Sequence, residues 1–338
     1  MIQKYTILKE DYPELVNKIK IRSNLDISEK RLPQDGRIQY ADYDIRVSIL
    51  PTLYGEKIVL RILGQDAASL SIEKIGFSEL EKKNYLEGVR KPNGIILISG
   101  PTGSGKTTTL YATLRMLNDE KRNIVTVEDP VEYTLEGINQ VQLKESIGLS
   151  FASALRSFLR QDPDVIMLGE IRDGETAQMA IRAALTGHLV LSTIHTNSAW
   201  GTISRLIDMG VPPFLLANTI NTTVAQRLVR KLCESCKVEK VLESKDWPMQ
   251  QTEFEIPEKH FVAVGCDKCH YTGYKGRTAL YEVIPIDSNL AENIKNNEMP
   301  NENRLNEKGV RSLAKGAYEY LNQGITSLEE VYPLLTSY

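Results

Sequence analysis

The sequence predicts an α/β fold in which a largely parallel sheet is covered by helices on both faces. From about residue 92, short apolar runs alternate with stretches of helical periodicity, the pattern of repeated strand and helix units. A glycine-rich turn follows the first of these runs and opens a helical stretch. Four cysteines form two CxxC pairs further along the chain. With 338 residues, the chain is long enough for two or more domains.

The composition is that of an ordinary globular protein, with 41% hydrophobic and 25% charged residues. A net charge of −3 excludes a global basic field that would recruit nucleic acid or an anionic membrane. The sequence has neither the apolar segment of a signal peptide nor about 18 consecutive apolar residues for a membrane span. We therefore expect a cytoplasmic protein.

Residues 1–90 are expected to form a smaller α+β domain. Residues 11–29 space their apolar side chains at helical intervals, and two strand-like runs follow, YDIRVSIL and EKIVLRIL, joined by a hairpin-like PTLYG. Alternation within these runs places Arg46 and Arg61 on the faces opposite the isoleucines, free to contact something outside their own core. Taken alone, the strand pattern favours an ordinary surface charge for either arginine.

Residues 91–338 are expected to form the main α/β domain. GIILIS, NIVTVE, DVIMLG and HLVLSTI are the strand candidates, and helices are expected near residues 106–118, 150–161 and 174–185. After His195 we expect further helices, a cysteine-bearing element over residues 230–275 and a helical tail over residues 286–338.

The octapeptide GPTGSGKT fits the G-x-x-x-x-G-K-[ST] pattern, between a strand and a helix as that pattern requires. Its backbone N–H groups and the helix N-terminus would surround the phosphates of a nucleotide. Lys106 would reach the β- and γ-phosphates, and Thr107 would bind Mg²⁺. The alternative is a plain glycine-rich turn. The predicted ATP contacts are Gly100, Pro101, Thr102, Gly103, Ser104, Gly105, Lys106, Thr107 and Thr108.

Carboxylates follow two of the predicted strands. TVEDPVEY ends a strand with Glu128, Asp129 and Glu132, which are either solvated surface or groups that hold a metal ion or orient water. The apolar run of DVIMLGEIRD ends at Gly169, where a metal-binding aspartate often stands, so the next residue, Glu170, is the candidate for activating water. The alternative is a structural ion pair between Glu170 and Arg172.

Two histidines bracket the strand candidate in GHLVLSTIHTN. His188 precedes the apolar run and His195 follows it. A histidine at a strand end is either a hydrogen-bonded structural group or a group that senses phosphate. The sequence leaves these two roles open.

The two CxxC pairs predict a metal site. Cys233, Cys236, Cys266 and Cys269 offer four thiolates, which suit a closed tetrahedral Zn²⁺ site with a structural role. Such a site would fasten the insert between the pairs to the rest of its domain. Four unmetallated thiols and an iron–sulfur cluster are the alternatives.

The order of these motifs resembles that of the type II secretion and type IV pilus assembly ATPases, members of the secretion ATPase superfamily. The resemblance extends from NLDISEKRLPQDGR to GYKGRTALYEV. GPTGSGKT resembles the Walker A box, TVEDPVEY the Asp box, LGEIRD an atypical Walker B box and GHLVLSTIHTN the His box. It implies a RecA-like P-loop NTPase core with a zinc-bearing, mostly helical C-terminal region.

The resemblance also implies residue roles. Glu170 would be the catalytic carboxylate, assisted by Lys106 and the Asp box and His box residues. RVS and VLR are similar to segments that offer arginines to nucleotide, here Arg46 and Arg61, with Arg160 and Arg277 as weaker candidates. The tetracysteine element is typical of assembly rather than retraction motors. The first domain lacks an ASDIHIEP-like segment, so we expect it to be shortened at its start.

The function that the resemblance implies is a cytoplasmic hexameric ATPase that powers assembly of pilin or pseudopilin filaments. The expected partners are copies of itself, an inner-membrane platform protein and the filament machinery, so membrane association is indirect, and no nucleic acid is expected. The alternatives are a retraction or DNA-transfer motor of the same superfamily and a zinc-stapled nucleic-acid-binding module.

Overall fold

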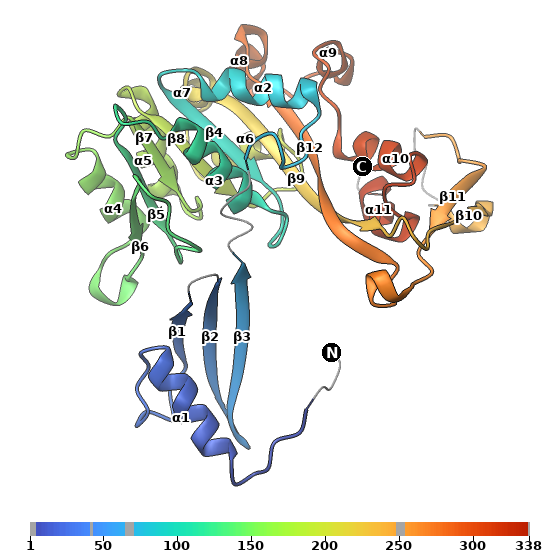
Figure 1. Cartoon of the computed structure of the whole chain (residues 1–338). Helices are drawn as coiled ribbons and strands as arrows, with labels where there is room; N and C mark the ends of the chain where they lie inside the picture. Colours follow the sequence, from blue (N-terminus) through green and yellow to red (C-terminus); the bar gives the residue numbers. More distant parts are fainter. Residues whose placement is uncertain (1–4, 41–42, 65–70, 248–253, 337–338) are drawn as a thin grey trace. The chain divides into compact units, whose positions relative to one another are not determined.

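The computed structural model describes residues 5–40, 43–64, 71–247 and 254–336, which belong to two compact units, Met1–Ser69 and Leu70–Tyr338 (Figure 1). The units divide earlier than the 90/91 boundary expected from the sequence. Helix α2 (Glu79–Val89) belongs to the larger unit, because Tyr85 and Val89 are buried in one of its two cores.

The smaller unit contains an antiparallel sheet and the helix α1. Within its described residues, the strands have the order β1-β2-β3, and α1 packs on one face. A two-residue loop joins β2 to β3, since Thr52 pairs with Gly55, as the hairpin-like PTLYG predicts. Val47 and Ile49 are fully buried beneath the helix. The elements are α1 (Tyr12–Arg22), β1 (Gln34–Gln39), β2 (Tyr43–Thr52) and β3 (Gly55–Gly64).

The larger unit contains a mixed sheet. Among the described residues it has seven strands in the order β12-β9-β4-β8-β7-β5-β6, all parallel to their neighbours except β12, which is antiparallel to β9. The strands are β4 (Gly94–Ser99), β5 (Ile124–Glu128), β6 (Asn139–Gln142), β7 (Val165–Leu168), β8 (Leu189–Ile194), β9 (Ile220–Leu232) and β12 (Tyr274–Pro285).

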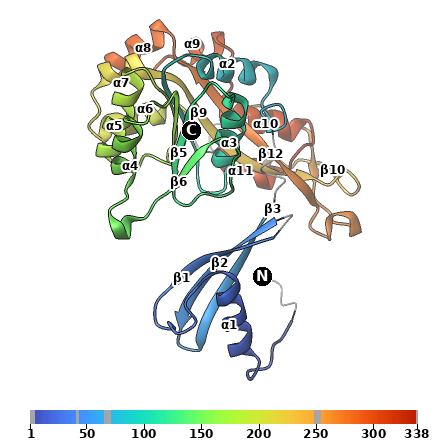
Figure 2. The same cartoon turned by 60° about the vertical axis from the view of Figure 1, so that its left-hand side comes forward.

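Helices cover both faces of this sheet (Figures 1 and 2). In β4, Ile95 and Leu97 enter the core on the side of α4 and α5, whereas Ile96 and Ile98 enter the core on the side of α2 and α3. A strand buried on both faces reads as a continuous apolar run, which explains GIILIS. The predicted α/β fold is confirmed. The helices that flank the parallel strands are α3 (Lys106–Leu117), α4 (Phe151–Phe158), α5 (Gly174–Leu185), α6 (Gly201–Asp208) and α7 (Pro213–Thr219).

Two long strands were not anticipated after His195. β9 and β12 form an antiparallel ribbon on the open side of β4, in a region where we expected helices and the cysteine element. β9 has the sequence INTTVAQRLVRKL, in which buried Asn221, Thr222, Thr223 and Gln226 interrupt the apolar pattern of a strand.

The described residues of the C-terminal part form a small hairpin and four α-helices. β10 (Val238–Val241) pairs with β11 (Lys259–Val262), and this hairpin lies in the insert between the two cysteine pairs. The tail folds into α8 (Ser288–Lys295), α9 (Glu302–Glu307), α10 (Leu313–Asn322) and α11 (Leu328–Leu335).

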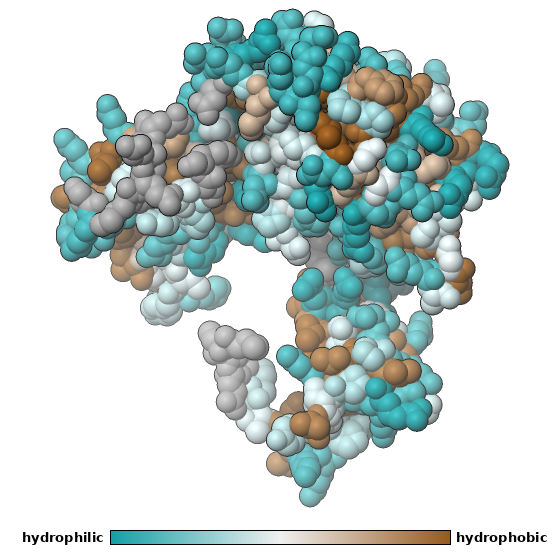
Figure 3. Space-filling model, turned by 180° about the vertical axis from the view of Figure 1, so that it is seen from behind, coloured by the Kyte–Doolittle hydropathy of each residue, from teal (hydrophilic) through white to brown (hydrophobic). Residues whose placement is uncertain are grey.

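The surface is mainly hydrophilic on the face shown in Figure 3, with separate hydrophobic patches on both units. In the described part of the chain, none of the helices has the length and apolar character to cross a lipid bilayer.

Candidate functional site

The segments that follow four parallel strands lie at one edge of the large sheet. β4, β8, β7 and β5 are successive neighbours that run in the same direction, so their C-terminal ends meet at that edge. Ligands of open α/β sheets bind at the carboxyl edge. β4 leads into the phosphate loop, β8 into His195, β7 into Gly169 and Glu170, and β5 into Asp129.

The phosphate loop between β4 and α3 has a backbone that requires glycine. φ is 147° at Gly100, 82° at Gly103 and 89° at Gly105, values that residues with a Cβ rarely adopt. A Cβ at Gly100 would lie 2.4 Å from the carbonyl oxygen of Gln226. Gly105 has no side chain with which to cap α3, so the first N–H groups of the helix remain for a ligand. This loop fits the phosphates of a nucleotide.

Lys106 occupies the interior of the loop. Its Nζ donates hydrogen bonds to the carbonyl oxygens of Gly100 at 2.7 Å and Pro101 at 3.0 Å. Burial lowers the pKa of Lys106, and the negative charge of Glu170 opposes that shift. The next side chain, Thr107, is exposed and Thr108 is half-buried, so the Thr107 hydroxyl is accessible to a metal ion.

Glu170 lies at the centre of a charged cluster. Its Oε1 accepts a hydrogen bond from Arg172 at 2.5 Å, and its Oε2 lies 3.4 Å from Nε2 of His195. The Arg172 guanidinium also lies 3.5 Å from a carboxylate oxygen of Asp129. Burial raises the pKa of Glu170, but the hydrogen bond from Arg172 and the charges of Arg172, His195 and Lys106 lower it below its ordinary value. The carboxylate is therefore ionised at neutral pH, as a base requires.

The Asp box carboxylates differ in their surroundings. Glu128 is buried and accepts hydrogen bonds from Tyr111, from Thr126 at 2.6 Å and from Gln140 at 3.1 Å. Asp129 reaches the cluster around Glu170, whereas Glu132 is half-buried and its N–H donates to the Tyr111 hydroxyl. Asp129 is thus the member placed to contact a ligand, and Glu128 supports the strand beneath it.

The two histidines lie at opposite edges of the sheet. His195 joins Glu170 at the carboxyl edge, but His188 precedes β8, about 20 Å away for a strand of this length. The Nδ1 of His188 lies 2.9 Å from the carbonyl oxygen of Ala183, at the end of α5. Within this unit, the structure does not bring His188 to the phosphate loop.

The predicted arginines are divided between the two units. Arg46 and Arg61 belong to the smaller unit, where they are direct partners on β2 and β3. Arg160 follows α4, is exposed and donates to the carbonyl oxygen of Arg156 at 3.0 Å, and Arg277 is exposed on β12 opposite Arg230.

Two residues beside the phosphate loop, Arg227 and Glu282, were not predicted from the sequence. Arg227 donates to the carbonyl oxygens of Gln226 at 3.0 Å and Asn197 at 3.2 Å, and thus joins β9 to the segment after His195. Glu282, on the neighbouring β12, is buried and accepts from the N–H of Ala199 at 3.4 Å. These contacts come from the unanticipated ribbon β9–β12, so no local motif could have indicated them.

The four cysteines form one cluster. Among the described residues, their Sγ atoms all lie within 4.8 Å of one another, and three pairs are separated by 3.8–3.9 Å. A tetrahedral site with Zn–S bonds of about 2.3 Å requires sulfur atoms about 3.8 Å apart. Burial raises the pKa of Cys269, but N–H groups of Cys266 and Gly273 lower it to about 6. The cluster fits Zn²⁺.

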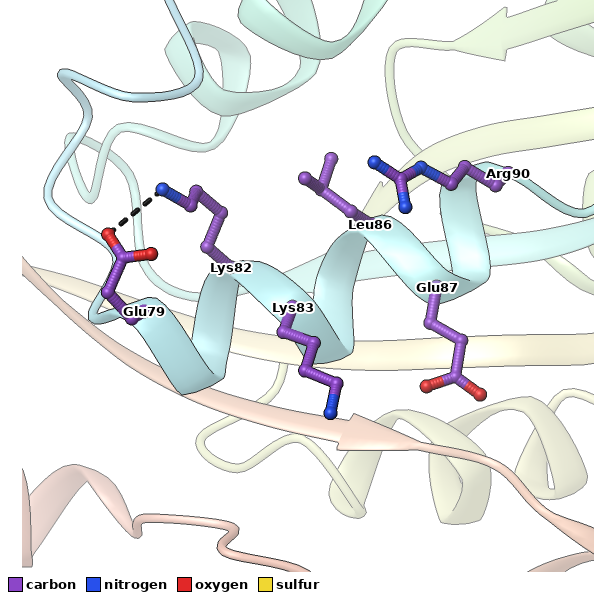
Figure 4. Close-up of a pocket in the computed structure, with 6 residues that line it drawn as sticks. All are labelled: Glu79, Lys82, Lys83, Leu86, Glu87 and Arg90. Atoms are coloured by element: carbon purple, nitrogen blue, oxygen red, sulfur yellow. Dashed lines mark hydrogen bonds and ion pairs between the residues drawn. The ribbon is translucent and has the colours of Figure 1, made fainter.

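A depression of about 430 Å³ beside α2 is the competing candidate for a ligand site (Figure 4). Its lining comes from α2 and its C-terminal cap alone, and Lys82 is already paired with Glu79 at 2.9 Å. Because no other element contributes a group to it, this depression lacks the converging polar side chains of a binding site.

Comparison with known proteins points to one family. The type II/IV secretion system protein family matches residues 6–333. The chain is 49% identical over 325 residues to the type II secretion system protein E of Pseudomonas aeruginosa, covering 94% of this chain and 64% of that protein. It is 48% identical to the type IV pilus assembly ATPase PilB of Myxococcus xanthus, covering 94% of this chain and 58% of that protein. The chain thus spans less than two thirds of these relatives.

Solved structures share the fold. The pilus retraction motor PilT with bound ADP aligns with a TM-score of 0.68 at 27% identity, over 95% of this chain and 82% of that chain. The Legionella pneumophila ATPase DotB aligns with a TM-score of 0.69 at 21% identity, over 100% of this chain and 86% of that chain.

Proposed function

Because the chain belongs to the type II/IV secretion system protein family, we propose that it hydrolyses ATP to drive assembly of pilin or pseudopilin filaments. The observation that carries the proposal is the cluster at the carboxyl edge. There, Arg172 and His195 contact the Glu170 carboxylate, and the positive charge of Lys106 in the phosphate loop lowers the pKa of Glu170. That arrangement joins a phosphate-binding loop to an ionised base.

The proposed mechanism uses groups of the larger unit. N–H groups at the start of α3 bind the phosphates, and Lys106 exchanges the carbonyl oxygens of Gly100 and Pro101 for phosphate oxygens. Thr107 and Asp129 would hold Mg²⁺, which would neutralise phosphate charge. Glu170 orients water and takes its proton, while Arg172 and His195 fix the carboxylate.

The proposed coupling to movement involves the smaller unit. In this proposal, Arg46 and Arg61 contact the phosphates when the two units, or neighbouring subunits, close. Their guanidinium groups then stabilise the charge that develops during phosphoryl transfer. A homo-hexamer is the proposed assembly, docked indirectly at the inner membrane through a platform protein. The relatives named as type II secretion and pilus assembly proteins support the proposed role in filament assembly.

A retraction motor is the second candidate, because the PilT structure aligns over 95% of this chain. The assembly function is preferred for two reasons. Identity to PilB is 48% compared with 27% to PilT, and the cysteine cluster fits the structural zinc expected for assembly motors.

Glu170→Gln tests the proposal. The amide keeps the size of the side chain but cannot take a proton, so we expect ATP turnover to fall by about 100-fold or more while Mg-ATP still binds. Release of inorganic phosphate measures turnover, and isothermal titration calorimetry measures binding.

Glu175→Gln is the matched control. This residue pairs with Arg156 on the exposed surface, so the same chemical change should leave turnover within about twofold. Turnover that survives in Glu170→Gln would remove Glu170 from the mechanism.

A further inference from the structure

The smaller unit carries a row of three arginines across its sheet. Arg37 on β1 is the direct partner of Arg46 on β2, and Arg46 is the direct partner of Arg61 on β3. Directly opposite residues of antiparallel strands project from the same face. Arg46 and Arg61 were anticipated from the sequence, but Arg37 was not.

This row lies on the face opposite α1. The helix packs through Ile19 against Ile38, Val47 and Ile49, whose side chains alternate with those of the arginines. The Arg37 side chain is 27% exposed, Arg46 is half-buried and Arg61 is exposed, so the row remains accessible to solvent.

Like charges in directly opposed positions destabilise a sheet. One carboxylate offsets part of this charge, because Asp44, diagonally across from Arg37, forms an ion pair with it. Among the described carboxylates, none forms an ion pair with Arg46 or Arg61. The sheet therefore has a surplus of positive charge at one row.

The row has the dimensions of a polyphosphate. Strands lie about 4.8 Å apart, so the outer backbone positions, those of Arg37 and Arg61, are about 10 Å apart. Arginine side chains are long enough to converge from there on adjacent phosphates, which their planar groups bind through paired hydrogen bonds.

We propose that Arg37 is a third phosphate-binding residue of the smaller unit and that Asp44 holds its guanidinium until nucleotide is bound. The inference rests on the proposed function for the identity of the anion. Binding moves the Arg37 guanidinium from the carboxylate to a phosphate oxygen.

Two substitutions break the same ion pair with opposite consequences. Arg37→Gln removes the guanidinium, so the affinity of the full-length chain for magnesium AMP-PNP should fall by about tenfold. Asp44→Asn removes the competing carboxylate, so affinity should be unchanged or higher. A purely structural ion pair predicts equal losses for both variants, which would overturn the inference, as would no loss for Arg37→Gln.

Two further variants complete the calorimetric experiment. Arg31→Gln removes the same charge from a side chain that is 88% exposed and should leave affinity within about twofold. Lys106→Ala tests the proposed function separately. If this variant binds AMP-PNP as the wild type does, the proposed function fails; if it loses binding while Arg37→Gln does not, only the inference about Arg37 fails.

Discussion

The carboxyl group of Glu282, on β12, is almost completely buried. Its side chain is 7% exposed, and within the described residues one of its oxygens has no hydrogen-bond partner. Burial raises the pKa of Glu282 from 4.5 to about 7, with the Ala199 N–H and the charge of Arg227 opposing the shift. The group is therefore partly protonated near neutral pH.

This shift makes the free energy of unfolding depend on pH. The folded state binds the Glu282 proton more tightly than the unfolded state, so the stabilisation is complete below about pH 4.5 and is lost as pH rises through about 7. The substitution Glu282→Gln removes the ionisable group, so this decrease in the free energy of unfolding at higher pH should not occur. Relative to wild type, the variant should gain on the order of 3 kcal/mol between pH 5 and pH 8 in urea unfolding.

The exposed Glu120→Gln makes the same chemical change away from the interior. It should leave the pH profile of unfolding unaltered. Parallel profiles for wild type and Glu282→Gln would show that the Glu282 carboxyl is not the source of the dependence.

Some site residues could be predicted because the functional side chain and the strand that positions it lie in one short segment of the sequence. The phosphate loop that leads to Lys106 follows β4, Glu170 lies just after β7, and parallel strands bring those ends together. His188 shows the limit, because it flanks the same strand as His195 but at the edge away from the phosphate loop. Arg227 and Glu282 depend on which strand pairs with which, and local sequence does not encode that pairing.

At the scale of elements, burial on both faces made the central strands predictable. GIILIS and HLVLSTI are continuous apolar runs because helices cover both of their faces. β9 was not predicted because Thr222 and Thr223 are polar residues, although both are buried in the structure. The contacts of β9 with α2 and β4, which bury it, arise from tertiary packing and are not encoded in the local sequence.

The cysteine element has its own test. We expect the purified chain to carry about one zinc ion per chain, measured by mass spectrometry of metals. Removing zinc with a chelator should make all four thiols react with Ellman's reagent. It should also permit proteolysis between Cys233 and Cys269, because the metal no longer links the two ends of the insert. Nucleotide binding at the phosphate loop should persist.

Re-adding zinc should restore protection and provides the control. Since the chain has four cysteines and all lie in the cluster, thiol counting reports on this site alone. Four reactive thiols in the native chain, with no zinc and with the insert protected, would show that the element closes without metal.

At the scale of the whole molecule, the chain separates its groups between two units. Lys106 and Glu170 lie in the unit Leu70–Tyr338, and the arginine row lies in the unit Met1–Ser69. The proposed coupling of hydrolysis to movement depends on this separation. The loss of phosphate charge on hydrolysis can move one unit against the other only if groups of both units bind the phosphates. Sequence alternation anticipated the strand faces of Arg46 and Arg61, whereas the alignment of Arg37 with them required the register of the sheet.

The most direct test is a structure of the zinc-replete chain with magnesium and an ATP analogue. The account predicts phosphates within hydrogen-bond distance of the N–H groups at the start of α3, and Lys106 Nζ moved from the carbonyl oxygens of Gly100 and Pro101 onto them. A nucleotide bound elsewhere, with Lys106 still on those carbonyl oxygens, would contradict it.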